Sequence, residues 1–324
     1  MSRSRPPGSR RRLTVRTLGS IFKRALAGWW NDEVPRLGAS LAYYTLFSLA
    51  PILVIAIAIG GLIFGEEAVR GELVGQIQGL LGRRGAEAVQ AMLEGAAQES
   101  SSVAATVAGI VTFFVTSTGA FLELQTALNH IWRVKPKASG SFFKALLMQR
   151  LISFALVVAL GFLLVTSLVV STALAAIHKF MGNAFPGVLV LWEALNVVVS
   201  LGVITLLFAM VYKVLPDVKL TWRDVWIGGL VTAGLFTIGK LVIGLYLGTT
   251  SIASTYGAAG SVIVILVWVY YSAQIVLLGA EFTREYVQTF GRRPPPEEFA
   301  VKEDGKRGGA AAGKQDGGKA GKTT

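Results

Sequence analysis

The sequence lacks cysteine altogether and has only two histidines among its 324 residues. Without cysteine, the chain has no disulfide, no thiolate nucleophile and no cysteine-ligated zinc. His130 and His178 fall in segments predicted below to lie at opposite membrane surfaces, and no HExxH, Walker A or GxSxG motif occurs. These absences exclude the common zinc sites and the histidine-based catalytic triads. We therefore expect a protein that is not an enzyme and that holds no cofactor or metal ion.

Charged residues are also scarce, at 15% of the chain, whereas 53% of the residues are hydrophobic and the mean hydropathy is +0.58. A soluble domain has about a quarter of its residues charged. The apolar residues gather in runs, each long enough to cross a hydrocarbon core of about 30 Å as a helix. We therefore predict an all-α fold, a polytopic membrane bundle of six transmembrane helices at about residues 39–64, 102–122, 151–173, 188–211, 226–247 and 260–283.

The net charge of +12 is distributed unevenly along the chain. Of the 31 lysines and arginines, 26 lie in alternate connecting segments, which are residues 1–38, 123–150, 212–225 and 284–324. Only four lie in the remaining connections, at 65–101, 174–187 and 248–259. This alternation follows the positive-inside rule and predicts a multi-pass protein of the bacterial inner membrane with both termini in the cytoplasm. The positive charge thus reflects topology rather than a nucleic-acid partner, and it suits the anionic headgroups of membrane lipids.

The segments outside the spans differ in composition. Residues 1–12 are predicted to be a disordered basic arm, 13–290 the membrane domain, and 291–324 a disordered cytoplasmic tail rich in proline, glycine and lysine. Within 13–30, apolar residues at helical spacing predict an amphipathic helix, either lying in the inner membrane interface or packed on the bundle. Residues 65–101 carry two apolar stripes separated by GRRG, which predicts an outer helical hairpin.

Polar residues within the spans recur on single helix faces. Ser40, Tyr44 and Ser48 follow each other at steps of four in the first span, and Thr112, Thr116, Gly119 and Glu123 share one face of the second. Such residues either satisfy one another in helix interfaces or line a partly hydrated cavity. Because four of the predicted spans each place polar groups on one face, the pattern favours a cavity. Near the inner ends, Glu123 and Glu281 have the further alternative of reaching the membrane interface.

Lys240 stands in the apolar stretch GLFTIGKLVIGLYLG, residues 234–248. An unpaired lysine at the bilayer centre costs about 2.5–3.5 kcal/mol on insertion scales, so a partner or water is expected there. The fourth span runs opposite to the fifth and brings Glu193 and Asn196 to a similar depth, so we predict a Glu193–Lys240 pair or a water shared between them. The alternative is that the lysine side chain snorkels to the outer interface.

Three stretches resemble a known family. LGASLAYYTLFSLAPIL (37–53), FTIGKLVIGLY (236–246) and YGAAGSVIVILVWVYYSAQIVLLGAEF (256–282) are similar to the YihY/BrkB family of bacterial inner-membrane proteins. The resemblance covers about residues 20–290 and implies six membrane helices and a permease-like or envelope-maintenance role. It also implies that Lys240, Tyr246, Tyr256, Gly257 and Glu281 belong to the family pattern. Some members were labelled ribonucleases, a label that fits this chain badly because the histidine cluster needed to bind metal is absent.

The leading functional prediction is a transporter-like protein that moves a polar or amphiphilic substrate through a central cavity. Lys240 would hold negative charge, and Tyr43, Tyr44 and Gln274 would offer hydrogen bonds along the path, with Glu193, Asn196, Tyr256 and Glu281 as further pathway residues. The expected partners are membrane lipids, with anionic phospholipid as one candidate substrate, and both a monomer and a homo-oligomer are compatible with the sequence. The alternative is a scaffold that transports nothing and binds envelope partners or lipid surfaces.

Overall fold

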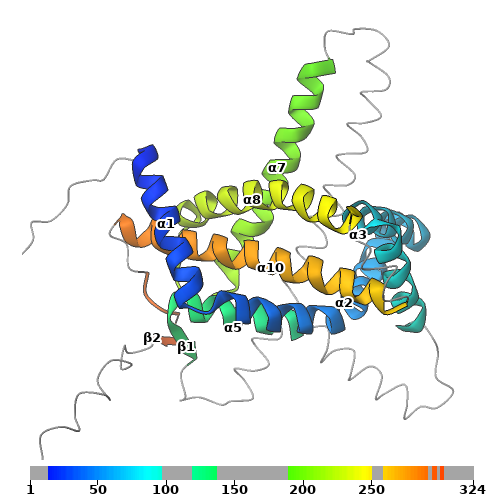
Figure 1. The fold of residues 1–324 in the computed structure, drawn as a ribbon, viewed down its shortest axis with the longest axis horizontal. Helices are drawn as coiled ribbons and strands as arrows, with labels where there is room; N and C mark the ends of the chain where they lie inside the picture. Colours follow the sequence, from blue (N-terminus) through cyan, green and yellow to red (C-terminus); the bar gives the residue numbers. More distant parts are fainter. Residues whose placement is uncertain are drawn as a thin grey trace, which may run out of the picture.

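A computed structural model describes residues 14–96, 119–136, 189–249, 258–290, 294–297 and 300–302. Apart from one short two-stranded sheet, the regular structure of these residues is helical, as the all-α prediction requires (Figure 1). The helices are α1 (Val15–Asn31), α2 (Val34–Phe64), α3 (Glu66–Ala96), α5 (Gly119–Trp132), α7 (Leu189–Val214), α8 (Trp222–Thr249) and α10 (Ala258–Thr289). The strands are β1 (Val134–Pro136) and β2 (Ala300–Lys302), which pair antiparallel.

Four helices of the described residues are long and apolar enough to span a membrane. Their spanning stretches, Val34–Leu62, Val197–Val214, Trp222–Tyr246 and Val262–Thr289, correspond to the first, fourth, fifth and sixth predicted spans. The predicted span at 151–173 and most of the one at 102–122 lie outside the described residues. The prediction of six spans is therefore tested at these four, and each is a helix.

The helix expected at 13–30 is present as α1, and it packs against α10. Ile21 and Ala25 of α1 are fully buried and form a small cluster with Phe282 of α10. The chain then turns sharply through Asp32 and Glu33, which has a positive φ of 52°, and α2 begins with Pro35 in its first turn. This arrangement matches the alternative in which the helix rests on the bundle, and its position relative to the membrane surface stays a prediction.

The predicted hairpin at 65–101 is helical over its described part, and no non-helical residue separates its two predicted halves. α3 runs from Glu66 to Ala96 and passes through the GRRG sequence without a break. A glycine inside a helix costs only about 1 kcal/mol relative to alanine, which is less than is needed to end a long helix. Both predicted stripes pack into one cluster with α2 and α10, which includes Val69, Val89, Ile57 and Ile265.

A tight interface joins α8 to α10. A Cβ atom on Gly279 of α10 would overlap the hydroxyl oxygens of Thr232 and Tyr212. The Tyr212 hydroxyl donates to the Val276 carbonyl at 2.7 Å and lies 2.9 Å from Thr232 Oγ1. This part of the bundle is therefore closely packed, with its hydroxyl groups satisfied by neighbours, which is how polar residues commonly serve helix contacts in membranes.

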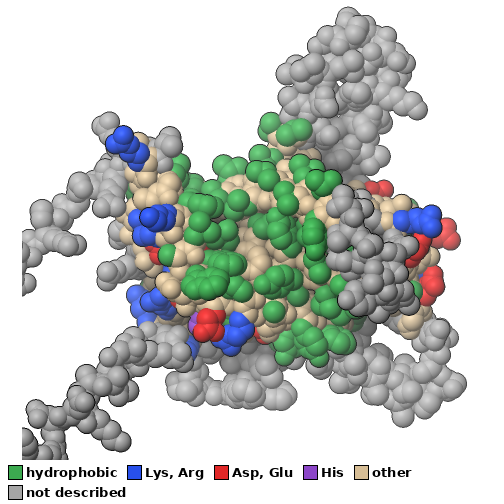
Figure 2. Space-filling model, viewed as in Figure 1, with side chains coloured by type: hydrophobic (Ala, Val, Ile, Leu, Met, Phe, Trp, Pro, Cys, Tyr) green, Lys and Arg blue, Asp and Glu red, His purple; other side chains and the backbone are tan. Residues whose placement is uncertain are grey.

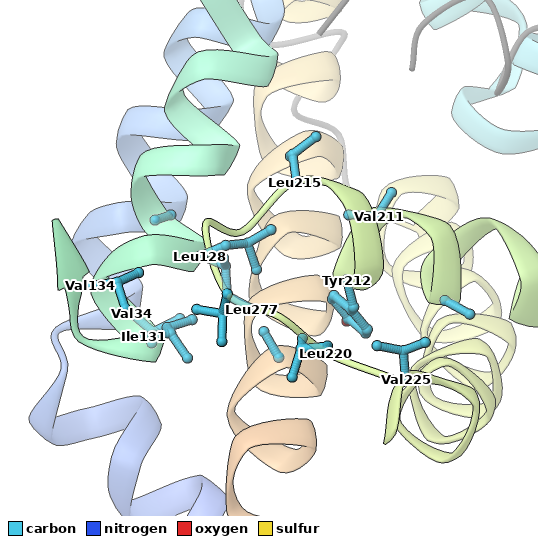
Figure 3. Packing of buried hydrophobic residues seen from close by; sticks show 14 residues of the cluster. Val34, Leu128, Ile131, Val134, Val211, Tyr212, Leu215, Leu220, Val225 and Leu277 are labelled. Carbon is cyan, nitrogen blue, oxygen red and sulfur yellow. The ribbon is translucent and has the colours of Figure 1, made fainter. Parts of the chain in front are cut away.

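Four connecting segments meet at one end of the bundle. Val34 of α2, Val134 of β1, Leu220 of the α7–α8 connection and Leu277 of α10 belong to one buried cluster at this end (Figure 3). β2 pairs with β1, and Pro296 forms an isolated bridge with Val218. We call this the basic end, because it gathers the described parts of the four segments in which lysine and arginine concentrate.

The strand β2 corrects part of the tail prediction. The predicted disordered tail, 291–324, includes residues 294–297 and 300–302. In the structure, residues 300–302 pair with β1 and Pro296 bridges to Val218, so both pieces lie against the basic end. The Lys219 backbone N–H donates to the Pro295 carbonyl, and the Glu297 N–H donates to that of Asp217, each at 3.0 Å. These main-chain bonds compensate for the low apolar content on which the prediction rested.

Candidate functional site

The surface of the bundle separates charged from apolar side chains along its length. Figure 2 shows hydrophobic side chains over the middle of one face, lysines and arginines chiefly near α1, and most of the acidic side chains at the α3 end. An apolar middle between two charged ends is the pattern that a bilayer requires of a membrane protein. The candidate residues are best located relative to this pattern.

Lys240 is exposed on α8. Its neighbour Gly239 faces α10, where an added Cβ would lie 2.5 Å from Ile275 Cδ1. Successive residues of a helix are rotated by about 100°, so Lys240 points away from this contact. Tyr246, the last residue of the spanning stretch Trp222–Tyr246, lies six positions after Lys240, which is about 9 Å along the helix axis.

The surroundings of Lys240 are apolar. Ile238, Leu241 and Leu245 are 63%, 67% and 71% exposed. Thr237 satisfies its own hydroxyl by donating to the Ala233 carbonyl at 2.8 Å. Among the described side chains, no carboxylate lies within ion-pair distance of Lys240. The backbone of α7 is described at Glu193 and Asn196, but the side chains of these two residues are not, so their pairing with Lys240 stays a prediction.

The other predicted pathway residues lie on different helices. Tyr43 and Tyr44 of α2 are 58% and 44% exposed, and their rings meet edge to face with centroids 5.7 Å apart. Gln274 of α10 accepts a hydrogen bond from the Trp29 indole N–H at 3.1 Å. Tyr256 lies outside the described residues. Among described side chains, no hydrogen bond or ion pair connects these groups to Lys240.

The polar face predicted for the first span contacts α5. Ser40 Oγ donates to the Glu123 carboxylate at 2.5 Å, and the Ala120 backbone N–H donates to Ser48 Oγ at 3.2 Å. The polar faces predicted for the first and second spans therefore contact each other where both are described. Here the groups satisfy one another across a helix interface, which was one of the two interpretations of the pattern.

Glu281 occupies a buried ion network that the sequence reasoning missed. Its side chain is fully buried, and Arg284 Nη2 lies 2.8 Å from Glu281 Oε2. Arg284 Nη1 donates to Asp32 Oδ2 at 2.6 Å and to the Ile131 carbonyl at 2.7 Å. The guanidinium therefore joins the α1–α2 junction, the end of α5 and α10. Glu281 is therefore enclosed by protein, and its depth relative to the membrane interface stays a prediction.

Three further charged residues surround this network. Arg133 Nη2 lies 3.6 Å from Asp32 Oδ1, and Arg24 of α1 pairs with Glu285 of α10 at 2.9 Å. Burial of Asp32 alone would raise the pKa of its carboxyl, but the hydrogen bond and the charge of Arg284 outweigh that effect and lower it below the usual value. Asp32 therefore binds the network in its ionised form at neutral pH.

A sequence signal for this network exists. Arg284 follows Glu281 by three residues at the end of the sixth apolar run, so both project on one side of the helix. A charged pair so close to the membrane calls for further opposite charge, and Asp32 is one of the acidic residues of the inner segments. The missing information was which of the connecting segments lies beside the end of α10.

A second polar cluster secures the α7–α8 connection. Asn129 donates to Asp217 Oδ2 at 2.8 Å and accepts from the Asp217 backbone N–H at 2.8 Å, and Gln125 donates to Oδ1 at 3.1 Å. These bonds fix the connection to α5. Their geometry is that of a structural contact, since each carboxylate oxygen has a dedicated amide donor.

Comparison with known proteins identifies the family. The family model described as virulence factor BrkB matches residues 25–303. A UPF0761 membrane protein of Ralstonia nicotianae is 30% identical over 276 residues, which are 83% of this chain and 59% of the relative. A UPF0761 membrane protein of Psychrobacter is 28% identical over 265 residues, covering 81% of this chain and 47% of the relative. A UPF0761 membrane protein of Acinetobacter baylyi is 28% identical over 256 residues, covering 77% of this chain and 58% of the relative.

The chain thus spans less than two thirds of the length of these relatives. No solved structure matches the chain. The family match covers most of the sequence, and the apolar helices agree with the membrane proteins that it resembles. The chain is therefore an integral, multi-pass membrane protein that belongs to the YihY/BrkB family.

Proposed function

We propose that this protein moves an amphiphilic, anionic substrate across the bacterial inner membrane, and that Lys240 neutralises the substrate's negative charge. An anionic phospholipid is the first candidate substrate. The observation that carries the proposal is the exposed ammonium group of Lys240 within an exposed apolar surface. We take the protein to be a carrier or permease-like protein rather than an enzyme.

The chemistry around Lys240 favours an amphiphile over a small polar solute. A polar solute passing Lys240 would have to remain against Ile238, Leu241 and Leu245, which offer it no hydrogen bond. An anionic lipid complements both parts of this surface, because its headgroup pairs with the ammonium and its acyl chains contact the aliphatic side chains. Pairing also offsets the cost of holding a cation inside the membrane.

The route would pass further polar groups, of which Tyr43 and Tyr44 are exposed and Gln274 is half-buried. Tyr43 and Tyr44 present phenol rings on the surface of α2, where an amphiphile finds both an apolar ring and a hydroxyl. Gln274 lies on α10, between α2 and α8 in the bundle (Figure 1). In this proposal these groups assist a headgroup, whereas Glu281 belongs to the ion network at the basic end.

A scaffold that transports nothing is the second candidate. It is favoured by the number of contacts that fix the basic end, where β1, β2 and the α7–α8 connection are all held by main-chain or amide bonds. A scaffold gains from such rigidity because its binding surface is kept in place.

Lipid movement in reconstituted vesicles tests the proposal. The full chain is placed in vesicles with fluorescent phosphatidylglycerol or phosphatidylcholine, and transbilayer movement is followed by dithionite quenching. Lys240→Ala is expected to slow the anionic lipid at least tenfold, which corresponds to about 1.4 kcal/mol, while Lys240→Arg retains movement. Lys302→Ala is the matched control, because Lys302 is exposed on β2, outside the spans.

The outcomes separate the two candidates. Equal movement of the anionic lipid in Lys240→Ala and the parent would refute the role given to this lysine. Movement no faster than in protein-free vesicles would refute transport of these lipids and favour the scaffold.

A further inference from the structure

The contact between α1 and α10 combines a small apolar patch with buried charges. Ile21, Ala25 and Phe282 are the buried apolar residues of the cluster between these helices. The charged contacts lie on either side of it: Arg24 with Glu285, and Asp32 with Arg284. Partly buried apolar residues, among them Phe22 and Leu278, pack around this patch, so apolar contacts and ion pairs together attach α1.

The buried charges are incompletely satisfied. Within the described structure, the Nε of Arg284 is buried without a hydrogen-bond partner, and the buried Glu281 carboxyl contacts only Asp32 and Arg284 among polar side chains. A buried charge that lacks its hydrogen bonds carries a large desolvation cost. If α1 moves away from α10, water reaches these atoms and that cost is recovered. The closed arrangement and an open, hydrated one are thereby brought closer in free energy.

Gly28 shows how closely α1 approaches these charges. A Cβ on Gly28 would lie 2.6 Å from Glu281 Oε2 and 3.0 Å from Arg284 Nη2. A larger residue there must displace the ends of these two side chains or move α1 away from α10, and either change disturbs the ion pair. In contrast, a Cβ on Gly19 of the same helix meets nothing within 4 Å. The close approach is thus a local property of the helix beside the ion pair.

We propose that Asp32, Glu281 and Arg284 form a latch that holds α1 against α10, and that α1 detaches as a unit when the latch opens. The open state exposes Ile21, Ala25 and the facing side of α10, while the core cluster of the basic end stays folded. This gives the protein a conformational switch at the basic end. It is independent of the substrate proposed above, so the two proposals fail separately.

The absence of native cysteine makes the latch directly testable. Ala25→Cys, at a fully buried position of α1, reports detachment through its labelling rate with a water-soluble maleimide. Ala127→Cys, at a fully buried position of α5 in the core cluster, reports general unfolding. The full chain is studied in lipid nanodiscs, in which both ends are open to solvent.

Two latch variants are compared with one matched control in both reporter backgrounds. Asp32→Asn removes a charge from the latch, and Gly28→Ala places a methyl group against the side-chain ends of Glu281 and Arg284. We expect each to raise the labelling rate of Ala25→Cys at least tenfold and to leave that of Ala127→Cys within twofold. Gly19→Ala adds the same methyl group at an open position, and it is expected to leave both rates within twofold of the parent.

The proposal is supported if both latch variants raise the labelling rate of Ala25→Cys and leave that of Ala127→Cys within twofold. The latch is overturned if the rate for Ala25→Cys is unchanged in either variant. It is equally overturned if both reporters accelerate together, because α1 would then be a permanent part of the fold whose loss unfolds the basic end.

Discussion

The α8–α10 interface yields a prediction whose size follows from the structure. Replacing Gly279 with alanine places a Cβ that overlaps Thr232 Oγ1 and Tyr212 Oη and lies 2.9 Å from Thr232 Cβ. Carbon atoms in contact prefer about 3.5–4.0 Å, so the helices must separate by roughly 0.6 Å or more. The neighbouring atoms belong to Thr232 and Tyr212, whose side chains are fully buried and hydrogen-bonded, so neither can easily move aside.

Three effects then set the change in the free energy of unfolding. Overpacking costs about 1–3 kcal/mol, and weakening the contact between Tyr212 and Thr232 costs about 0.5–1.5 kcal/mol. The better helix propensity of alanine returns about 1 kcal/mol. We expect Gly279→Ala to lose about 1–3 kcal/mol. Gly234→Ala on α8, where a Cβ meets nothing within 4 Å, should be neutral or more stable than the parent.

Reversible unfolding in mixed detergent, followed by circular dichroism, measures both variants. The double variant Gly279→Ala/Thr232→Ala removes the Thr232 hydroxyl, the nearer of the two obstructing groups, and Tyr212 keeps its bond to the Val276 carbonyl. It should therefore be more stable than Gly279→Ala alone, which is a non-additive result expected only for residues in contact. If Gly279→Ala is as stable as Gly234→Ala, the account of a closely packed interface is wrong.

Further predictions concern the basic end. The lowered pKa of Asp32 means that its contribution to stability is present above the usual aspartate value of 3.8 and is lost as pH falls through the lower folded value. Thermal unfolding measured from pH 5 downward should thus show a smaller acid loss in Asp32→Asn than in the parent, and identical pH profiles would contradict this. Asn129→Leu leaves Asp217 with Gln125 as its remaining side-chain donor and should cost about 1–3 kcal/mol of unfolding free energy, whereas Thr126→Leu at an exposed position of α5 should stay within about 0.5 kcal/mol. Equal stability of these two variants would refute the structural role of the amide cluster.

The spans tested by the structure were predictable because hydrophobic runs of this length have few alternatives. The sixth run predicted 260–283, and the helix extends from Ala258 to Thr289. Its last two turns contain the charged residues Arg284 and Glu285, at which a hydropathy pattern predicts the end of the helix. Their ion pairs with Asp32 and Arg24 stabilise these turns as helix. A hydropathy pattern cannot predict a helix end that is fixed by tertiary contacts.

The candidate site was only partly accessible from sequence. Periodicity indicated that Ser40 and Ser48 share one helix face that points inward, and the structure shows that this face meets α5 rather than an open space at these two residues. Periodicity could not say which way Lys240 points, since α8 is apolar on nearly every side. Nor could it identify Asp32 as the partner of Arg284, because these residues lie 252 positions apart and meet only through the fold.

The central claim is that Lys240 is open to the membrane surroundings instead of being sealed between helices. A nitroxide attached at position 240 in a full-length Lys240→Cys variant, in lipid nanodiscs, measures this through its collision rate with dissolved oxygen, which concentrates in lipid. Leu241 and Ile243 supply the references, because they are 67% and 7% exposed. We predict that position 240 collides with oxygen at a rate near that of position 241. A rate as low as that of position 243 would contradict the account.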